Sequence, residues 1–215
     1  MKKFASSVLS MVFALSVLAA EVAPDLLARE VTDKIVALLK ANKNVYTKDH
    51  KKLYAMVDEH VLPNFDFRAM SRTVLGRYWR TADEEQRARF TREFRDLLVR
   101  TYATALLKYN DETIVYLPFR LSPDDRTATV KSEVRRTDGG PPIAINYSFY
   151  RTDAGWKVYD VTIEGASLVT TYQSTYSARV QREGVNALIA NLAQDNKAAA
   201  EGKTVSNGTK ASSPK

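Results

Sequence analysis

No cysteine occurs in the 215-residue sequence. This absence excludes thiol nucleophiles, redox-active pairs and cysteine-based metal sites. Only two histidines, His50 and His60, are present, which is too few for a histidine-rich metal centre. The eight glycines lie singly or in turns and form none of the motifs that bind nucleotides or carry a nucleophilic serine. We therefore expect no metal, no cofactor and no catalytic site of these kinds.

A concentrated positive charge is also missing from the middle of the chain. The net charge is +7, but residues 1–20 carry +2 and residues 197–215 carry +3, which leaves only +2 for residues 21–196. A nucleic-acid-binding surface needs basic residues gathered on one face. We therefore expect no nucleic-acid partner.

Long hydrophobic runs are absent beyond the first twenty residues. Lys2 and Lys3 precede an uncharged run that ends in small residues, which is the order of a secretory signal with cleavage after Ala19 or Ala20. The alternative is an uncleaved anchor, but the run is short and contains four serines, whereas a span needs about 20 apolar residues. We expect residues 1–20 to be a cleaved signal peptide and the mature protein to be periplasmic.

The remaining chain divides into a domain and a tail. Residues 197–215 are rich in small and polar residues and predict a frayed helix end that passes into disorder. Residues 21–196 contain enough apolar residues to build one buried core. We expect this domain to be a monomer.

Helical periodicity dominates the first part of the domain. Apolar residues recur at helical spacing over about 24–42, 48–61 and 82–109, with a broken helical stretch at about 65–79.

The helix starts carry recognisable capping residues. Thr81 and Glu84 match a capping box for the longest helix. Asp66 is expected to cap the broken stretch, and Ser167 to cap a later helix that Gly184 interrupts.

Four segments between these helices have the composition of strands separated by turn residues, at about 112–121, 126–136, 143–152 and 156–164. Short separators predict antiparallel neighbours. Helices, then four antiparallel strands, then helices form an α+β pattern.

Alternation is clearest in the third of these strands. Ile143, Ile145, Tyr147 and Phe149 share one face of it. Tyrosines on an apolar face can line a cavity, because the ring contacts hydrocarbon while the hydroxyl finds a polar partner. Long helices around a sheet often enclose a pocket.

Four segments carry a resemblance to a known family. The most specific is Leu-Gly-Arg-Tyr-Trp at residues 75–79, followed by an acidic capping turn and Phe-x-x-x-Phe-Arg at 90–95. The segments that match are residues 61–80, 94–102, 156–161 and 164–169. Together they resemble the toluene-tolerance (MlaC) family over about residues 25–195.

The resemblance implies a single domain in which helices and an antiparallel sheet enclose a deep apolar cavity for phospholipid acyl chains. It implies a periplasmic phospholipid shuttle with no catalytic step, which maintains outer-membrane lipid asymmetry. Its partners would be an inner-membrane ABC transporter complex with an MCE-domain ring and an outer-membrane lipoprotein–porin complex. A related branch of the family is associated with hopanoid lipids, and the motifs do not separate the two ligands.

Ten residues are expected to contact the ligand. Six follow from their positions in the family motifs: Val74, Leu75, Tyr78, Tyr102, Ala166 and Val169. Ile143, Ile145 and Tyr147 follow from the alternation of the third strand, and Leu106 lies on the apolar stripe of the longest helix.

Two other classes of protein remain open at this point. A cavity enzyme of cone-like α+β fold would use Asp66 or Asp160 with a tyrosine hydroxyl, and would place a buried carboxylate in its pocket. In a cell-envelope adaptor, all the apolar stripes would be packed in the hydrophobic core, and there would be no cavity.

Overall fold

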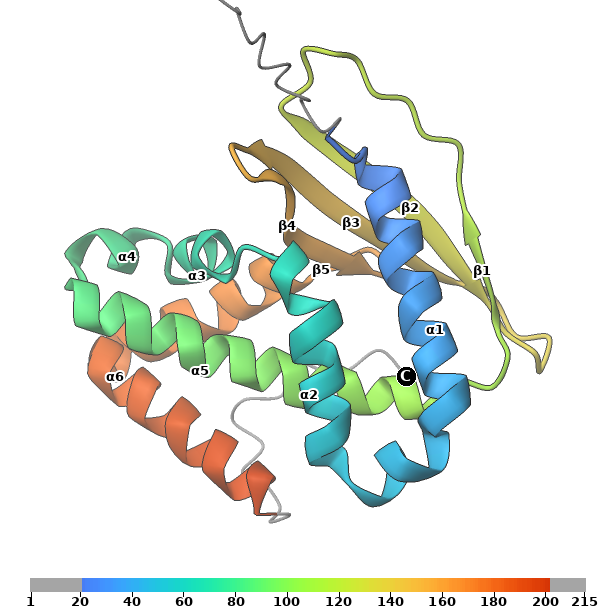
Figure 1. Cartoon of the computed structure of the whole chain (residues 1–215). Helices are drawn as coiled ribbons and strands as arrows, with labels where there is room; N and C mark the ends of the chain where they lie inside the picture. Colours follow the sequence, from blue (N-terminus) through green and yellow to red (C-terminus); the bar gives the residue numbers. More distant parts are fainter. Residues whose placement is uncertain (1–20, 202–215) are drawn as a thin grey trace, which may run out of the picture.

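The computed structural model describes residues 21–201 (Figure 1). The expected signal peptide and most of the expected tail lie outside the described residues. The elements are α1 (Pro24–Lys48), α2 (His50–His60), η1 (Leu62–Asn64), α3 (Phe67–Leu75), α4 (Arg77–Thr81), α5 (Glu84–Ala103), η2 (Thr104–Lys108), β1 (Thr113–Tyr116), β2 (Thr127–Arg135), β3 (Ile143–Thr152), β4 (Gly155–Ile163), β5 (Ala166–Ser167) and α6 (Leu168–Ala200). The α+β class expected from the sequence is confirmed.

The sheet is an antiparallel meander with the strand order β1-β2-β3-β4-β5. The sequence predicted four strands; the fifth is the two-residue β5, which pairs with the end of β4. β1 is also shorter than the predicted strand at 112–121: the Leu117 amide still donates to the Lys131 carbonyl of β2, but residues 118–126 form a long connection to β2. β1 and β5 are therefore the edges of the sheet.

N-capping side chains mark the start of α3 and α6. Asp66 Oδ1 accepts from the Ala69 amide at 2.8 Å, and Ser167 Oγ accepts from the Thr170 amide at 3.1 Å, so both expected caps are confirmed.

The expected capping box of the longest helix was placed on the wrong residues. Asp83 Oδ1 accepts from the Gln86 amide at 2.8 Å, and Gln86 Oε1 accepts from the Asp83 amide at 3.0 Å. Thr81 instead donates to the Tyr78 carbonyl, at the end of α4. Thr81 is the last residue of the short helix α4, so it is not the residue that precedes α5.

Gly184 bends α6 in the middle. Its backbone angles, φ 81° and ψ 165°, belong to a region that glycine alone adopts readily. The two halves of α6 consequently run in different directions (Figure 1). The helix ends at Ala200, beyond the domain boundary expected at residue 196.

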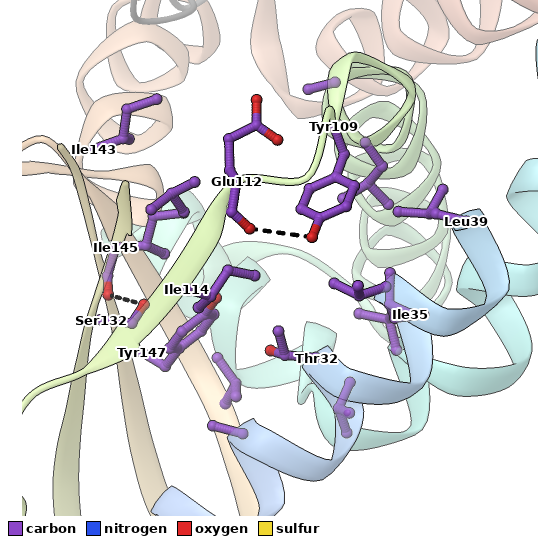
Figure 2. Close-up of a pocket in the computed structure, with 18 of the residues that line it drawn as sticks. Thr32, Ile35, Leu39, Tyr109, Glu112, Ile114, Ser132, Ile143, Ile145 and Tyr147 are labelled. Atoms are coloured by element: carbon purple, nitrogen blue, oxygen red, sulfur yellow. Dashed lines mark hydrogen bonds between the residues drawn. The ribbon is translucent and has the colours of Figure 1, made fainter. Parts of the chain in front are cut away.

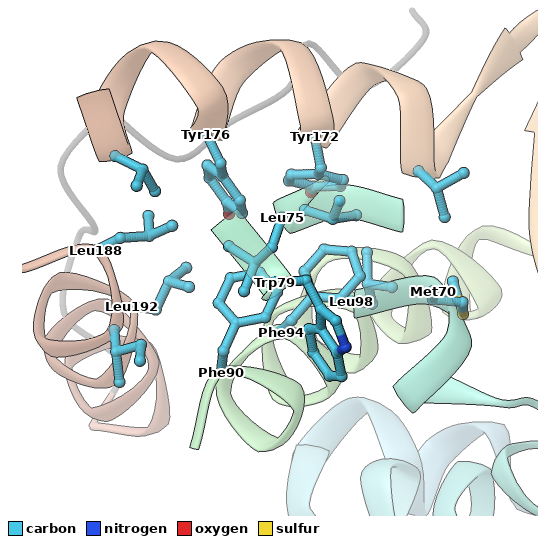
Figure 3. Packing of buried hydrophobic residues seen from close by; sticks show 14 residues of the cluster. Met70, Leu75, Trp79, Phe90, Phe94, Leu98, Tyr172, Tyr176, Leu188 and Leu192 are labelled. Carbon is cyan, nitrogen blue, oxygen red and sulfur yellow. The ribbon is translucent and has the colours of Figure 1, made fainter. Parts of the chain in front are cut away.

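Three groups of buried side chains organise the molecule. One of them packs α1 against α2 and α5, with Ile35, Leu39, Tyr46, Leu53, Met56, Val57, Val99 and Ala103. The helical core joins α3, α4, α5 and both halves of α6 (Figure 3), and consists of Met70, Val74, Leu75, Trp79, Phe90, Phe94, Leu98, Val169, Tyr172, Tyr176, Val180, Leu188, Ile189 and Leu192. A separate sheet core packs the first turns of α1 against the sheet, with Ala28, Val130, Phe149, Trp156, Val158 and Val161. Among residues 21–201, no helix is both long enough and apolar enough to cross a membrane.

Candidate ligand-binding pocket

A pocket of about 540 Å³ lies between α1 and one face of the sheet (Figure 2). α1, β1, β2 and β3 provide most of its walls, and η2 closes another side. The volume falls within the range of small-molecule pockets, about 300–1,000 Å³. Most of the lining side chains are aliphatic or aromatic. The pocket is therefore suited to hydrocarbon.

The helical wall of the pocket comes from one face of α1. Leu27, Val31, Ile35 and Leu39 recur every four residues, so their side chains line up along the helix. All four line the pocket. The apolar stripe that predicted this helix therefore lines the pocket, and its second half, Ile35 and Leu39, also packs against side chains of α2 and α5.

Polar contacts hold the middle of α1 against the edge strand. The Tyr116 hydroxyl lies 2.9 Å from the Ala28 carbonyl oxygen and 2.7 Å from Thr32 Oγ1. The Arg29 guanidinium lies over the Tyr116 ring, 4.4 Å from its centroid, as in a cation–π contact. β1 therefore fixes how far α1 stands from the sheet.

One ion pair holds the segment just before α1, and another holds the second half of the helix. Glu21 pairs with Arg151 of β3 at 3.1 Å, and Lys40 pairs with Asp111 at 2.8 Å. The hydrogen bond and the charge of Asp111 raise the pKa of Lys40, and the same contact lowers the pKa of Asp111. Both groups are consequently charged across the neutral pH range.

The sheet wall comes from one face of β3 and its neighbours. Ile143, Ile145, Tyr147 and Phe149 all line the pocket, which confirms the alternation expected for this strand. A bulge in the pairing with β4, between Ser148 and Phe149, leaves the pairing with β2 continuous. The four side chains therefore stay on one face.

Two hydroxyl groups lie among these apolar side chains. Ser132 Oγ donates to the Ile145 carbonyl at 2.9 Å, and the Ser132 hydroxyl is also hydrogen-bonded to Tyr147. Burial raises the pKa of Tyr147 well above its usual value, and the neighbouring Tyr116 adds to this. Tyr147 is therefore neutral, and its hydroxyl is satisfied without an ion in the pocket interior.

Charged lining residues gather at one end of the pocket, where η2 ends and β1 begins. They are Lys108, Glu112 and Arg136. Lys108, Arg136 and the neighbouring Ala105 are the lining residues most exposed to solvent. In Figure 2 Glu112 lies above Ile114, and Thr32 lies below it. The end near Glu112 is the mouth of the pocket.

Four of the ten expected ligand-contacting residues line the pocket: Leu106, Ile143, Ile145 and Tyr147. The other six do not. Leu75 is buried in the helical core (Figure 3), as are Val74 and Val169, and Tyr78 and Tyr102 pack against its side. Ala166 is exposed in β5.

The helical core is closely packed around aromatic rings. Phe94 and Tyr172 meet edge to face with their centroids 5.2 Å apart, and Phe90 meets Tyr176 in the same way at 6.2 Å. The hydroxyl of Tyr102 is hydrogen-bonded to Tyr172. The family motifs around Leu75 therefore lie in a packed interior, away from the pocket.

Residues on α1 and on the edge strand were not expected to touch a ligand. Leu27, Val31 and Ile35 appeared in the sequence only as a helical stripe, and Ile114 only as part of a strand. The apolar stripe of α1 was the only sequence signal for these helical residues. Periodicity shows that one face of a helix is apolar, but not whether that face packs against other side chains or lines a cavity.

Neither carboxylate required by the enzyme hypothesis lines the pocket. Asp160 is 8% exposed, and its Oδ1 accepts from the Val169 amide at 3.2 Å near the start of α6. Asp66 caps α3, and its second oxygen accepts from the Tyr150 hydroxyl. Both carboxylates therefore accept hydrogen bonds from backbone amides near the start of a helix, and neither is available in the pocket. Residues 21–201 also contain no group of three or more histidine or acidic side chains placed to bind a metal ion.

The model of the MlaC protein family matches residues 29–194. The chain belongs to the MlaC family. The matched residues run from the first turns of α1 to the second half of α6, and so include both walls of the pocket and the helical core. The family resemblance of the sequence is confirmed.

Two characterised relatives carry names from the same MlaC family. The intermembrane phospholipid transport system binding protein MlaC of Haemophilus influenzae is 24% identical over 164 residues, which cover 75% of this chain and 77% of that protein. The toluene tolerance protein ttg2D of Pseudomonas putida is 28% identical over 154 residues, which cover 71% of each chain.

A solved structure matches most of this MlaC-family fold. It is the phospholipid-binding protein from Ralstonia solanacearum in complex with a phospholipid. It is 32% identical, and the match covers 82% of this chain and 98% of that chain with a TM-score of 0.75. The names of the relatives indicate lipid-binding transport proteins and not enzymes.

Proposed function

We propose that this protein is a periplasmic phospholipid carrier whose pocket between α1 and the sheet shelters acyl chains. It moves lipid between an inner-membrane ABC transporter complex with an MCE-domain ring and an outer-membrane lipoprotein–porin complex, and so maintains outer-membrane lipid asymmetry. The observation that carries the proposal is the aliphatic pocket of about 540 Å³ in a chain of the MlaC family. The phospholipid in the structure of the Ralstonia relative supports the choice of ligand.

The physical need for such a carrier follows from the cost of exposing hydrocarbon to water. Each buried methylene contributes about 0.8 kcal/mol, so two chains of ~16 carbons amount to roughly 25 kcal/mol before opposing entropy. Free lipid therefore leaves a membrane extremely slowly. A pocket lined by Ile35, Ile145 and their neighbours offsets most of this cost and leaves the polar headgroup at the mouth.

The carrier itself has no directional preference. A protein that exchanges lipid equally well with two membranes only equilibrates lipid between them. It cannot drive net transport, because a shift in an equilibrium requires a difference in affinity. Direction therefore comes from the partner complexes, and in particular from the ATP-driven one. No catalytic residue is needed in the pocket.

Four of the ten expected contacts, Leu106, Ile143, Ile145 and Tyr147, are proposed to touch the acyl chains, together with the α1 face. We assign Val74, Leu75 and Val169 to the stability of the helical core, because each is less than 5% exposed and packed against side chains.

The test is native mass spectrometry of the protein purified from a bacterial periplasm without detergent, followed by lipid extraction. We expect an added mass that is released as phospholipid. A hopanoid would change the ligand and keep the carrier mechanism. A protein that is purified without bound lipid and takes up no lipid from vesicles would contradict the proposal and favour an adaptor role.

A matched pair of variants places the ligand in the pocket. Ile145→Trp fills the pocket from β3, and we expect it to remove most of the bound lipid. Ala144→Trp adds the same ring on the opposite, exposed face of the strand and should leave lipid occupancy unchanged. Equal occupancy in the two folded variants would show that the lipid lies elsewhere.

A further inference from the structure

We propose that the mouth of the pocket recognises a zwitterionic lipid headgroup, in which Lys108 binds the phosphate and Glu112 binds the outer ammonium. This inference rests on the proposed function, because it assumes that acyl chains fill the pocket behind the mouth. It adds a headgroup preference that the apolar walls alone do not provide.

Most charges around the mouth are already paired within the protein. Lys40 pairs with Asp111 at 2.8 Å. Arg136 lines the mouth, but its Nε and Nη2 atoms donate to Asp138, with Nε 3.0 Å from Oδ1. The charge of Glu112 also acts on Arg136, without a direct ion pair between them. Lys40 and Arg136 therefore each have an acidic partner within the protein.

Lys108 and Glu112 are different. Within residues 21–201 neither side chain forms an ion pair. Glu112 Oε2 accepts one hydrogen bond, from the Asn110 amide at 2.6 Å, which holds the carboxylate in place. The Glu112 carbonyl oxygen accepts from the Tyr109 hydroxyl at 3.1 Å, which fixes the backbone at the same point. The mouth therefore presents one unpaired cation and one unpaired, oriented anion.

One cation and one anion at the mouth match the two opposite charges of a phosphoethanolamine headgroup, which carries a phosphate and an ammonium. A lysine ammonium binds phosphate as a compact point charge, and a carboxylate accepts hydrogen bonds from a primary ammonium. A phosphoglycerol headgroup has no cation to offer Glu112, so the carboxylate only repels its phosphate. The mouth should therefore favour the zwitterion.

The expected size of the preference is modest because both groups are open to solvent. Exposed ion pairs typically shift an equilibrium by about 1.5- to 5-fold. We expect an enrichment in this range for phosphatidylethanolamine over phosphatidylglycerol with the same acyl chains.

The experiment offers the full-length mature protein vesicles that contain equal amounts of these two lipids. After the protein is separated from the vesicles, mass spectrometry gives both the total lipid held and the ratio of the two headgroups. We expect the wild type to be enriched in phosphatidylethanolamine. Glu112→Gln should bring the ratio close to that of the vesicles without changing the total, and Glu112→Lys should turn the preference toward phosphatidylglycerol.

Glu133→Gln is the matched control. It removes the same charge from β2, but its neighbours Ser132 and Val134 line the pocket, so Glu133 faces the other side of the sheet. It should keep the wild-type ratio.

A wild type that carries both lipids in the vesicle ratio, or a Glu112→Gln variant that keeps the wild-type enrichment, would overturn this inference and leave the carrier function standing. A wild type that takes up no lipid would overturn the proposed function, and this inference with it.

Discussion

At the residue scale, two tyrosines one turn apart on α6 differ in the hydrogen bonds of their hydroxyl groups. Tyr172 and Tyr176 are 1% and 0% exposed. The Tyr172 hydroxyl is hydrogen-bonded to Tyr102 and Thr101, whereas the Tyr176 hydroxyl is buried with no hydrogen-bond partner among the described residues. A buried polar group without a partner destabilises the folded state by about 1–3 kcal/mol.

We therefore predict opposite effects for the same substitution at the two positions. Tyr176→Phe removes an unsatisfied hydroxyl and should raise the free energy of unfolding by about 1 kcal/mol. Tyr172→Phe loses the bonds to Tyr102 and Thr101 and should lower it by about 1 kcal/mol. Urea unfolding of the two variants measures both. Equal losses of stability would mean that the Tyr176 hydroxyl has a partner.

The buried tyrosines also predict how stability depends on alkaline pH. Burial, with help from Asp66, raises the pKa of Tyr150 to about 12, and burial also raises the pKa of Tyr176 well above its usual value. Below about pH 10 these phenols are neutral in both the folded and unfolded states, so stability is intact. Above that pH only the unfolded chain ionises freely, and stability should fall as the pH rises through about 12. Unfolding midpoints measured across this range test the sign, and Tyr150→Phe should flatten the fall.

At the scale of elements, the start of α5 tests the corrected capping box. Asp83→Ala removes the side chain that accepts from the Gln86 amide and should lower the free energy of unfolding by about 1 kcal/mol. Thr81→Ala, at the position that the sequence favoured, should change it by less than about 0.5 kcal/mol. Thermal unfolding of both variants measures the difference, and a larger loss for Thr81→Ala would restore the original placement.

The sequence was sufficient for most elements because their signals are local. Helical stripes, turn residues between strands, and the caps at Asp66 and Ser167 depend on residues a few positions apart. The choice between Thr81 and Asp83 as cap was not decidable in this way, since both residue types cap helices well and only the course of α4 selects one.

The pocket was predictable only in part, for a different reason. The alternation of β3 identified Ile145 and Tyr147, because a strand presents one face to whatever it packs against. The stripe on α1 and the buried face around Leu75 have the same periodicity. One faces a cavity and the other a packed core, and that difference depends on the distance between elements far apart in the chain.

At the scale of the whole molecule, ligand binding should raise thermal stability. A ligand that binds only the folded state stabilises it by about 2.7 kcal/mol at one hundred times its dissociation constant. For a domain of this size this corresponds to a rise in Tm of about 5–10 °C. Calorimetry of delipidated and phospholipid-loaded protein measures the shift. Ile145→Trp should show none, and an unshifted wild type that demonstrably holds lipid would argue against binding in the pocket.

In the proposed transport cycle the protein is without lipid for part of the time, and it must stay folded until it binds the next lipid. The helical core shares none of its buried side chains with the lining of the pocket. Release of lipid would therefore remove hydrocarbon contacts from α1 and the sheet while Phe90, Phe94 and Tyr176 stay packed. On this proposal the lipid-free protein keeps its helical core and binds lipid again without refolding.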